Sequence, residues 1–398
     1  MHDSKADMKR AVLSAWMIST ALALTAACSG DASTPATVGE VKATAKPSGT
    51  VLDADRSLKR RDEALASARV WHPPTGPIAR ANLRDNPPGP MSVQADQELT
   101  CRFTTQEVSG TTPKFNCELP GGEVVKVKYG AANPELRAEV AATRLLIAFG
   151  FGADRMYVVK RVRCAGCPVF PFQSLKCLRK TGLKSACFPG GINYNRVVDF
   201  DSAVIERKVE GEKIEGTPNQ GWAWYDLDKI DPSRGGSPLA EVDALRLMAV
   251  LLAHWDNKAE NQRLVCPPGA EGPDGTCTRP LAIMQDLGAT FGPTKVDLNN
   301  WRNYQIWADG KTCRVSMKSL PFGGATFPDR QISDAGRLLL LGWLEQLSDD
   351  QLRDLFEGSR ITSFDQVTAA ARNPDVWIAV FKDKVKQIRD GGPCPTAS

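Results

Sequence analysis

A run of polar residues directly after an apolar helix constrains this chain most. The run is His254-Trp-Asp-Asn-Lys-Ala-Glu-Asn261, and a predicted strand after it ends in Gln285-Asp-Leu-Gly288. Asp256 and Asn261 share one short loop, while the carboxylate of Asp286 arrives on the later strand. Carboxylate and amide oxygens are the ligands that hard divalent cations prefer. A fold that uses this pattern must therefore bring the loop and the strand end together.

Three short segments of alternating polarity precede that run and predict antiparallel strands. They are residues 99–103, 115–119 and 124–129. The connection between the first two is rich in small residues. Its backbone N–H groups and hydroxyls could bind an anion, and the residues concerned are Ser109, Gly110, Thr111 and the nearby Lys114. In isolation this connection would be an ordinary hairpin loop, so only its context gives it weight.

Two helices have clear start signals. Asn133 and Pro134 begin the first, and Gly150 ends it. Ser237 and Pro238 begin the second, whose apolar side continues to residue 253 and so leads directly into the polar run. Periodicity and a capping box predict three more helices in the C-terminal third, over residues 332–347, from residue 349 onward, and over residues 377–389.

Taken in this order, the elements resemble a protein kinase. The spacing His254-x-Asp256-x-Lys258-x-x-Asn261 is that of the serine/threonine-kinase catalytic loop, and Asp286-x-Gly resembles the metal-binding motif that follows it. The resemblance implies an α+β, two-lobed protein-kinase-like fold. Its N-lobe would be a small antiparallel β-sheet with one key helix, and its C-lobe would be mainly helical.

Departures from the common pattern make the chain similar to atypical branches of that superfamily. Trp255 replaces the usual arginine, Leu287 replaces the usual phenylalanine, and no Ala-Pro-Glu follows. HipA-type bacterial kinases, phosphatidylinositol-kinase-like proteins and secreted kinases are the branches that it resembles.

The resemblance also implies roles for the polar run. Asp256 would orient or deprotonate the acceptor hydroxyl, and Lys258 would stabilise charge on the transferring phosphoryl group. Asn261 and Asp286 would hold Mg²⁺ or Mn²⁺. His254 is expected to be a buried structural residue.

A nucleotide site on the strands is implied as well. Lys128 would hold the ATP phosphates and pair with Glu139 on the first helix, with Lys126 and Glu135 as open alternatives. The loop over the phosphates would supply the remaining nucleotide-binding residues, Ser109, Gly110, Thr111 and Lys114.

The N-terminus has the pattern of an export signal. Residues 1–28 combine Lys9-Arg10, an apolar core and small residues before Cys28, which resembles a lipobox whose cysteine is lipidated. An ordinary cleaved signal peptide is the alternative. Residues 29–70 are predicted to be a disordered tether, although residues 55–69 could form a short helix. The N-lobe with a Cys-rich insertion would cover residues 95–212, and the C-lobe residues 213–395.

Cysteine counting agrees with export. Eleven cysteines become ten without Cys28, an even set compatible with an oxidising compartment. Local pairing favours Cys101–Cys117, Cys177–Cys187 and Cys266–Cys277, beside the C-x-x-C of Cys164 and Cys167 and the remaining Cys313 and Cys394. A four-cysteine zinc site, Cys164/Cys167 with Cys177/Cys187, is the alternative.

Three hypotheses result. The first is an exported, lipid-anchored phosphotransferase that uses metal-bound ATP and a protein, sugar or lipid hydroxyl as acceptor, with nucleotidyl transfer left open. The second is a catalytically silent kinase-fold lipoprotein that serves binding or envelope assembly. The third is a disulfide-stapled binding lipoprotein unrelated to kinases. The net charge of +4 is spread along the chain, so nucleic acid is not an expected partner.

Overall fold

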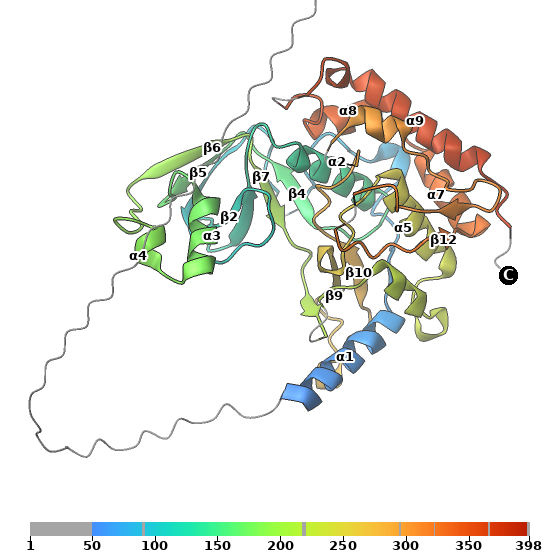
Figure 1. Ribbon diagram of the computed structural model, residues 1–398, viewed down its shortest axis with the longest axis horizontal. Helices are drawn as coiled ribbons and strands as arrows, with labels where there is room; N and C mark the ends of the chain where they lie inside the picture. Colours follow the sequence, from blue (N-terminus) through green and yellow to red (C-terminus); the bar gives the residue numbers. More distant parts are fainter. Residues whose placement is uncertain are drawn as a thin grey trace, which may run out of the picture. The chain divides into compact units, whose positions relative to one another are not determined.

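The computed structural model describes residues 50–89, 92–216, 220–293, 296–321, 323–364 and 367–395 (Figure 1). Residues 49–398 form one compact unit. The predicted signal peptide, Cys28 and the first part of the predicted tether lie outside the described residues. Within the described ranges, no helix combines the length and apolar character that a membrane crossing needs.

The N-terminal part of the unit is built on a seven-stranded sheet in the order β4-β7-β3-β2-β1-β5-β6. The strands are β1 (Glu98–Phe103), β2 (Lys114–Glu118), β3 (Val124–Lys128), β4 (Arg155–Val158), β5 (Arg161–Ala165), β6 (Val197–Asp201) and β7 (Val204–Arg207). The predicted antiparallel meander β1-β2-β3 is present. However, the sheet is larger than predicted and not wholly antiparallel, because β5 pairs with β1 in parallel.

The two faces of the sheet have different partners. Phe115, Cys117, Val125 and Val127 belong to one apolar cluster with Phe172 of helix α3 (Pro171–Thr181). Because side chains alternate along a strand, the lysines of β3 lie on the other face. Helix α2 (Pro134–Ala148) packs there against β4 and begins, as predicted, with Asn133, whose side chain accepts from the N–H of Glu135.

Helices dominate the C-terminal part. Their core is α5 (Leu239–Leu251), where ten consecutive residues from Val242 are buried, packed on α7 (Asp334–Leu344). Around them lie the helices α6 (Leu298–Asn303), α8 (Asp349–Gly358) and α9 (Pro374–Asp390). A three-stranded sheet consists of β8 (Glu212–Ile214), β9 (Gln262–Cys266) and β10 (Leu281–Met284). A two-stranded sheet consists of β11 (Arg314–Val315) and β12 (Arg330–Gln331). The predicted α+β class, with a sheet-rich N-terminal part and a helical C-terminal part, is confirmed.

Helix α1 (Thr50–Ala66) differs from the disordered tether predicted up to residue 70. Leu65 is fully buried, and the Arg61 guanidinium lies 2.7 Å from the Asp226 carboxylate with both side chains buried. Arg61 also donates to the carbonyl of Gly221 at 3.0 Å. These contacts fix the helix to the C-terminal part, so the predicted tether ends earlier than residue 70, and the helix expected over residues 55–69 is present as Thr50–Ala66.

All ten cysteines after Cys28 form disulfides. The bonds are Cys101–Cys117, Cys164–Cys167, Cys177–Cys187, Cys266–Cys277 and Cys313–Cys394. The three predicted local pairs are confirmed. The alternative four-cysteine zinc site was wrong, because disulfide sulfurs are not thiolates and cannot serve as its ligands.

Candidate active site

The polar run begins where helix α5 ends. Ala253 adopts a left-handed conformation with φ of 51°, and the N–H of His254 returns to the carbonyl of Ala249 at 3.0 Å. This bond and that from Ala253 to Val250 form a Schellman motif, which turns the chain sharply out of the helix. The buried helix therefore provides a rigid base for the loop that follows.

Asn257 holds the loop in shape. Its side chain is fully buried, donates to the carbonyl of His254 at 3.0 Å, and accepts from the N–H groups of Thr326 and Phe327 at 2.9 and 3.0 Å. Sequence reasoning missed this residue, since its partners come from a segment almost seventy positions later. Its position inside the run, between Asp256 and Lys258, was the only available signal.

The three predicted residues of the loop contact one another. Lys258 Nζ lies 2.9 and 3.0 Å from the two oxygens of Asp256, and Asn261 Nδ2 donates to the Asp256 carbonyl at 2.6 Å. The side chain of Asp256 is 26% exposed, so a solute can reach its carboxylate. Since the amide N–H₂ of Asn261 is committed to the backbone, its carbonyl oxygen is the atom left for a ligand.

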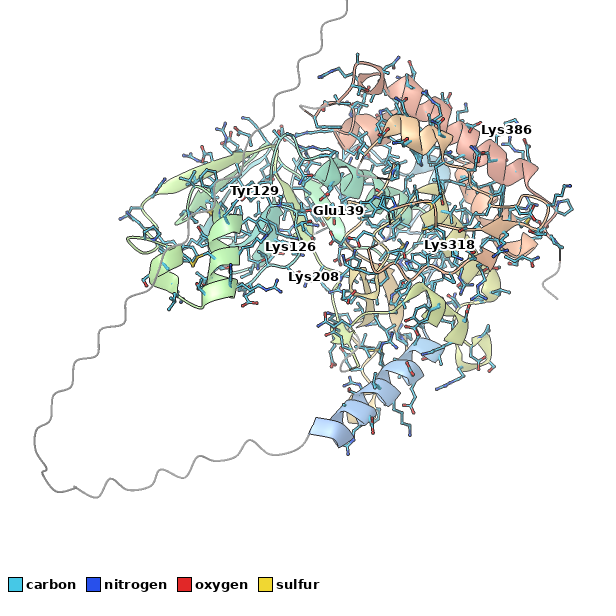
Figure 2. All side chains as sticks on the ribbon, in the orientation of Figure 1. Lys126, Tyr129, Glu139, Lys208, Lys318 and Lys386 are labelled. Atoms are coloured by element: carbon cyan, nitrogen blue, oxygen red, sulfur yellow. A yellow bond between two sulfur atoms is a disulfide. The ribbon has the colours of Figure 1, made fainter. Side chains whose placement is uncertain are left out.

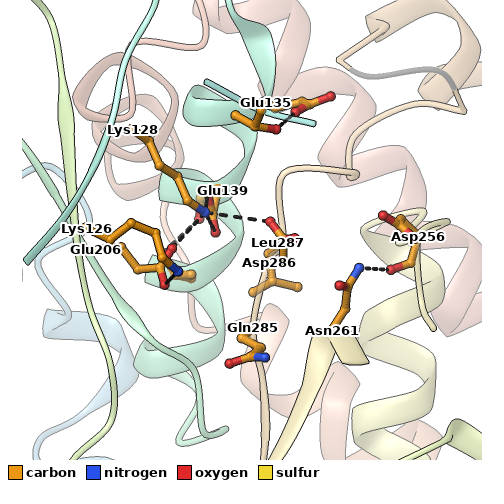
Figure 3. A network of polar contacts seen from close by, with 12 residues as sticks. Lys126, Lys128, Glu135, Glu139, Glu206, Asp256, Asn261, Gln285, Asp286 and Leu287 are labelled. Carbon is orange, nitrogen blue, oxygen red and sulfur yellow. Dashed lines mark hydrogen bonds and ion pairs between the residues drawn. The ribbon is translucent and has the colours of Figure 1, made fainter. Parts of the chain in front are cut away.

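The pairing of β9 with β10 brings Asp286 to this loop. Met284 lies opposite Gln262, and the N–H of Gln285 donates to the carbonyl of Asn261 at 3.0 Å. Asp286 comes next, with a left-handed φ of 54°. Figure 3 shows it between Lys128 on one side and Asn261 on the other. The two predicted metal ligands are thus neighbours, although they are far apart in the sequence.

A buried ion-pair cluster lies on the other side of Asp286 (Figure 3). Lys128 Nζ is 2.6 Å from Glu139, 2.8 Å from Glu206 and 3.6 Å from Asp286. Lys126 instead pairs with Glu206. Geometry therefore makes Lys128, and not Lys126, the lysine that pairs with Glu139.

The alternative carboxylate, Glu135, is engaged elsewhere. The hydroxyl of Thr112, in the loop before β2, donates to it. Glu139 is thus the α2 carboxylate in the cluster. Glu206 was missed as a member because its place depends on the pairing of β3 with β7, which puts it opposite Lys126. Local periodicity contains no information on that pairing.

The carboxyl groups of the cluster titrate differently. Burial raises the pKa of Glu139 to about 7, with Asp286 and Glu206 adding to the effect and Lys128 opposing it. Burial also disfavours the charged form of Glu206, but Lys128 and Lys126 outweigh it and lower its pKa. For Asp286, burial is likewise outweighed by Lys128 and Lys114, so its pKa is lowered. Asp286 is consequently ionised at neutral pH, and its side chain is 43% exposed.

The loop between β1 and β2 lies next to this cluster. Lys114 is buried, and burial together with the neighbouring Lys128 lowers its pKa. A Cβ on Gly110 would lie 3.2 Å from Lys114 Nζ, and φ of 80° at this glycine is disfavoured for other residues. Thr111 is exposed, and none of the described contacts joins it to the cluster.

A cavity of about 880 Å³ opens beside the cluster. Its walls come from the β1–β2 loop, the inner strands and the segment after β7, and they include Ser109, Asn116, Lys126, Glu206, Lys208 and Glu210. Lys126 and Lys208 are marked in Figure 2. Most of its lining residues are polar or charged, and Lys128, Glu139 and Asp286 are not among them.

The oxygen donors suit a divalent cation. An ionised, accessible carboxylate at Asp286 and the free amide oxygen of Asn261 are hard ligands of the kind that Mg²⁺ and Mn²⁺ accept. Two protein ligands leave most of the coordination sphere for water or phosphate oxygens, as is usual for Mg²⁺. The site residues therefore fit the metal that the sequence predicted.

The burial of His254 predicts that the stability of the fold depends on pH. Complete burial lowers its pKa to about 4, although Asp256 and Asp286 favour the charged form. Unfolding exposes a histidine with a pKa of about 6.5, so the native state binds fewer protons, and the free energy of unfolding falls as the pH drops below that value. We expect the wild type to lose about 2 kcal/mol more than His254→Leu between about pH 7.5 and about pH 5, measured by urea unfolding of both proteins. Groups such as Glu139 titrate in both proteins and cancel in this difference, so equal losses would contradict the assignment.

Comparisons with known proteins place the chain in no family. No family model matches it, and no curated protein does. Among solved structures, the Helicobacter pylori proinflammatory kinase CtkA aligns with 74% of this chain and 97% of its own, at 10% identity and a TM-score of 0.42. So weak a likeness does not assign a family or a reaction.

Proposed function

We propose that the protein is a kinase-like phosphotransferase that moves a phosphoryl group from metal-bound ATP to a hydroxyl acceptor. One observation supports this most. A buried Lys128–Glu139 pair, an ionised Asp286 3.6 Å from that lysine, and the loop of Asp256 and Asn261 converge on one site. Phosphoryl transfer needs this combination of positioned cations, metal-binding oxygens and a carboxylate near the acceptor.

Each group has a separate task in the proposed reaction. Lys128, held by Glu139, would bind phosphate oxygens, and Asn261 with Asp286 would hold the metal, which would neutralise phosphate charge. Asp256 accepts the proton of the acceptor hydroxyl. Lys258 then leaves its pair with Asp256 to stabilise charge on the transferring group.

The five disulfides support an oxidising compartment, and this is part of the proposal. Lipid anchoring through Cys28 remains a prediction from the sequence. The second candidate is a silent binding module. The observation in its favour is the Lys258–Asp256 pair at 2.9 Å, which occupies the carboxylate that the reaction needs.

Nucleotide binding by the full chain tests the proposal. ATP with Mg²⁺ or Mn²⁺ should raise the melting temperature by several degrees at about 100 times its dissociation constant, since a ligand specific for the native state stabilises it by about 2.7 kcal/mol there. Asp286→Asn should lose the part of the shift that depends on the metal. Asp199→Asn, an exposed carboxylate on β6, is the matched control and should keep it.

The outcomes separate the hypotheses. No shift in the wild-type chain, together with no effect of Asp286→Asn, would exclude a nucleotide site. Binding without transfer of a γ-phosphate label to the chain itself or to envelope extracts would favour the silent module.

A further inference from the structure

The Cys-rich insertion carries an unusual surplus of positive charge. Residues 160–198 contain eight lysines and arginines and no aspartate or glutamate. On β5, Arg161 and Arg163 pair with Asp201 and Asp199, which lie outside the segment. The cations on the helices are not neutralised in this way, because within the described part of the chain no ion pair involves Arg179, Lys180 or Lys184.

A disulfide gathers the unneutralised charges into one compact loop. Cys177 and Cys187 are bonded with their Cα atoms 5.6 Å apart, and we call residues 177–187 the stapled loop. It runs from the last turn of α3 through Gly182, at a left-handed φ of 69°, into α4 (Lys184–Cys187). Figure 1 shows α3 and α4 on the side of the N-terminal sheet that is remote from the C-terminal helices.

Apolar side chains are exposed in the same region. Leu183, between Lys180 and Lys184 in the stapled loop, is 59% exposed, and Phe170 at the start of α3 is 65% exposed. Nine large apolar residues are exposed among those described, and five of them lie within residues 169–197. Among the described residues, the insertion is therefore the part of the chain richest in exposed large apolar side chains.

We propose that the stapled loop docks on an anionic phospholipid surface. Cations flanking an exposed apolar side chain suit the membrane interface, where lysine and arginine meet headgroup phosphates and an apolar side chain enters the acyl boundary. An acidic protein is the other occupant that the charge would suit, and the test below separates the two. The disulfide orders the loop in advance, which reduces the entropy cost of docking.

Vesicle sedimentation of the full chain tests this proposal. Binding should be stronger to phosphatidylcholine vesicles containing about 30% phosphatidylglycerol than to phosphatidylcholine alone, and it should fall with added salt. The triple variant R179E/K180E/K184E should bind the anionic vesicles at least about 100-fold more weakly, and Leu183→Ser about threefold more weakly. All variants keep residues 1–49, so any contribution of that segment to binding is common to them.

The matched control has the same change in net charge elsewhere. R234E/K311E/R372E alters three exposed cations of the C-terminal part, and it should bind nearly as well as the wild type. Equal binding by the loop variant and the wild type would overturn the proposal, and so would an equal loss in the control. Loss of binding to an acidic protein with vesicle binding intact would assign the loop to a protein partner instead. All substituted side chains are exposed, so thermal melts should confirm unchanged folding.

Discussion

Replacing Asp256 by asparagine should lower the rate of phosphoryl transfer by at least about 100-fold and leave nucleotide binding intact. The amide keeps the shape of the carboxylate but cannot accept the proton of an acceptor hydroxyl. Asp256 belongs neither to the buried Lys128 cluster nor to the proposed metal ligands, so the nucleotide should bind as before. Initial rates of phosphate release from ATP, with water as the acceptor, measure the effect without knowledge of the natural acceptor.

Asp349→Asn provides the control for that experiment. Asp349 is also an accessible carboxylate paired with a lysine, at 2.8 Å from Lys382, but it lies at the start of α8. Its variant should retain the full rate. An Asp256→Asn variant that transfers phosphate as fast as the wild type would remove this residue from the reaction. No measurable phosphate release by the wild type, with ATP bound, would support the silent module.

The pairing at the centre of the site was predicted from the resemblance to kinases, and local signals placed its two residues on a strand and a helix. The β3 strand pattern placed Lys128 on one face, and the cap at Asn133 fixed the start of the helix that carries Glu139. The polar run followed a helix with an unmistakable apolar stripe. The three disulfides between cysteines that are close in the sequence were also predicted, since short loops close at little entropic cost.

The remaining features depend on contacts between distant segments. Glu206 joins the cluster only because β7 pairs with β3, eighty residues earlier in the chain. Asn257 acts through Thr326 and Phe327, and α1 is fixed by Arg61 reaching Asp226. Neither strand order nor tertiary ion pairs produce a periodic pattern of residues in a single sequence. The seven-stranded sheet and the packing of α1 therefore could not be predicted from the sequence.

Loss of Lys128 should destabilise the fold. Lys128→Met would leave the buried Glu139 without its cation, while Glu206 would keep Lys126. Removing one partner of a buried ion pair typically costs about 3–5 kcal/mol, and we expect a loss of about 3 kcal/mol in urea unfolding. Nucleotide binding should be lost as well.

A double-mutant cycle separates these two consequences. Glu139→Gln alone should cost less than Lys128→Met, because Lys128 would keep its ion pair with Glu206 at 2.8 Å. In the double variant, Lys128→Met meets a neutral amide instead of a buried carboxylate, so the combined loss should be at least about 1 kcal/mol smaller than the sum of the single losses. The stabilised double variant should still fail to bind ATP if Lys128 contacts phosphate. Recovered binding would mean that the lysine serves only to hold α2 against the sheet, and additive losses would mean that the two side chains are not coupled.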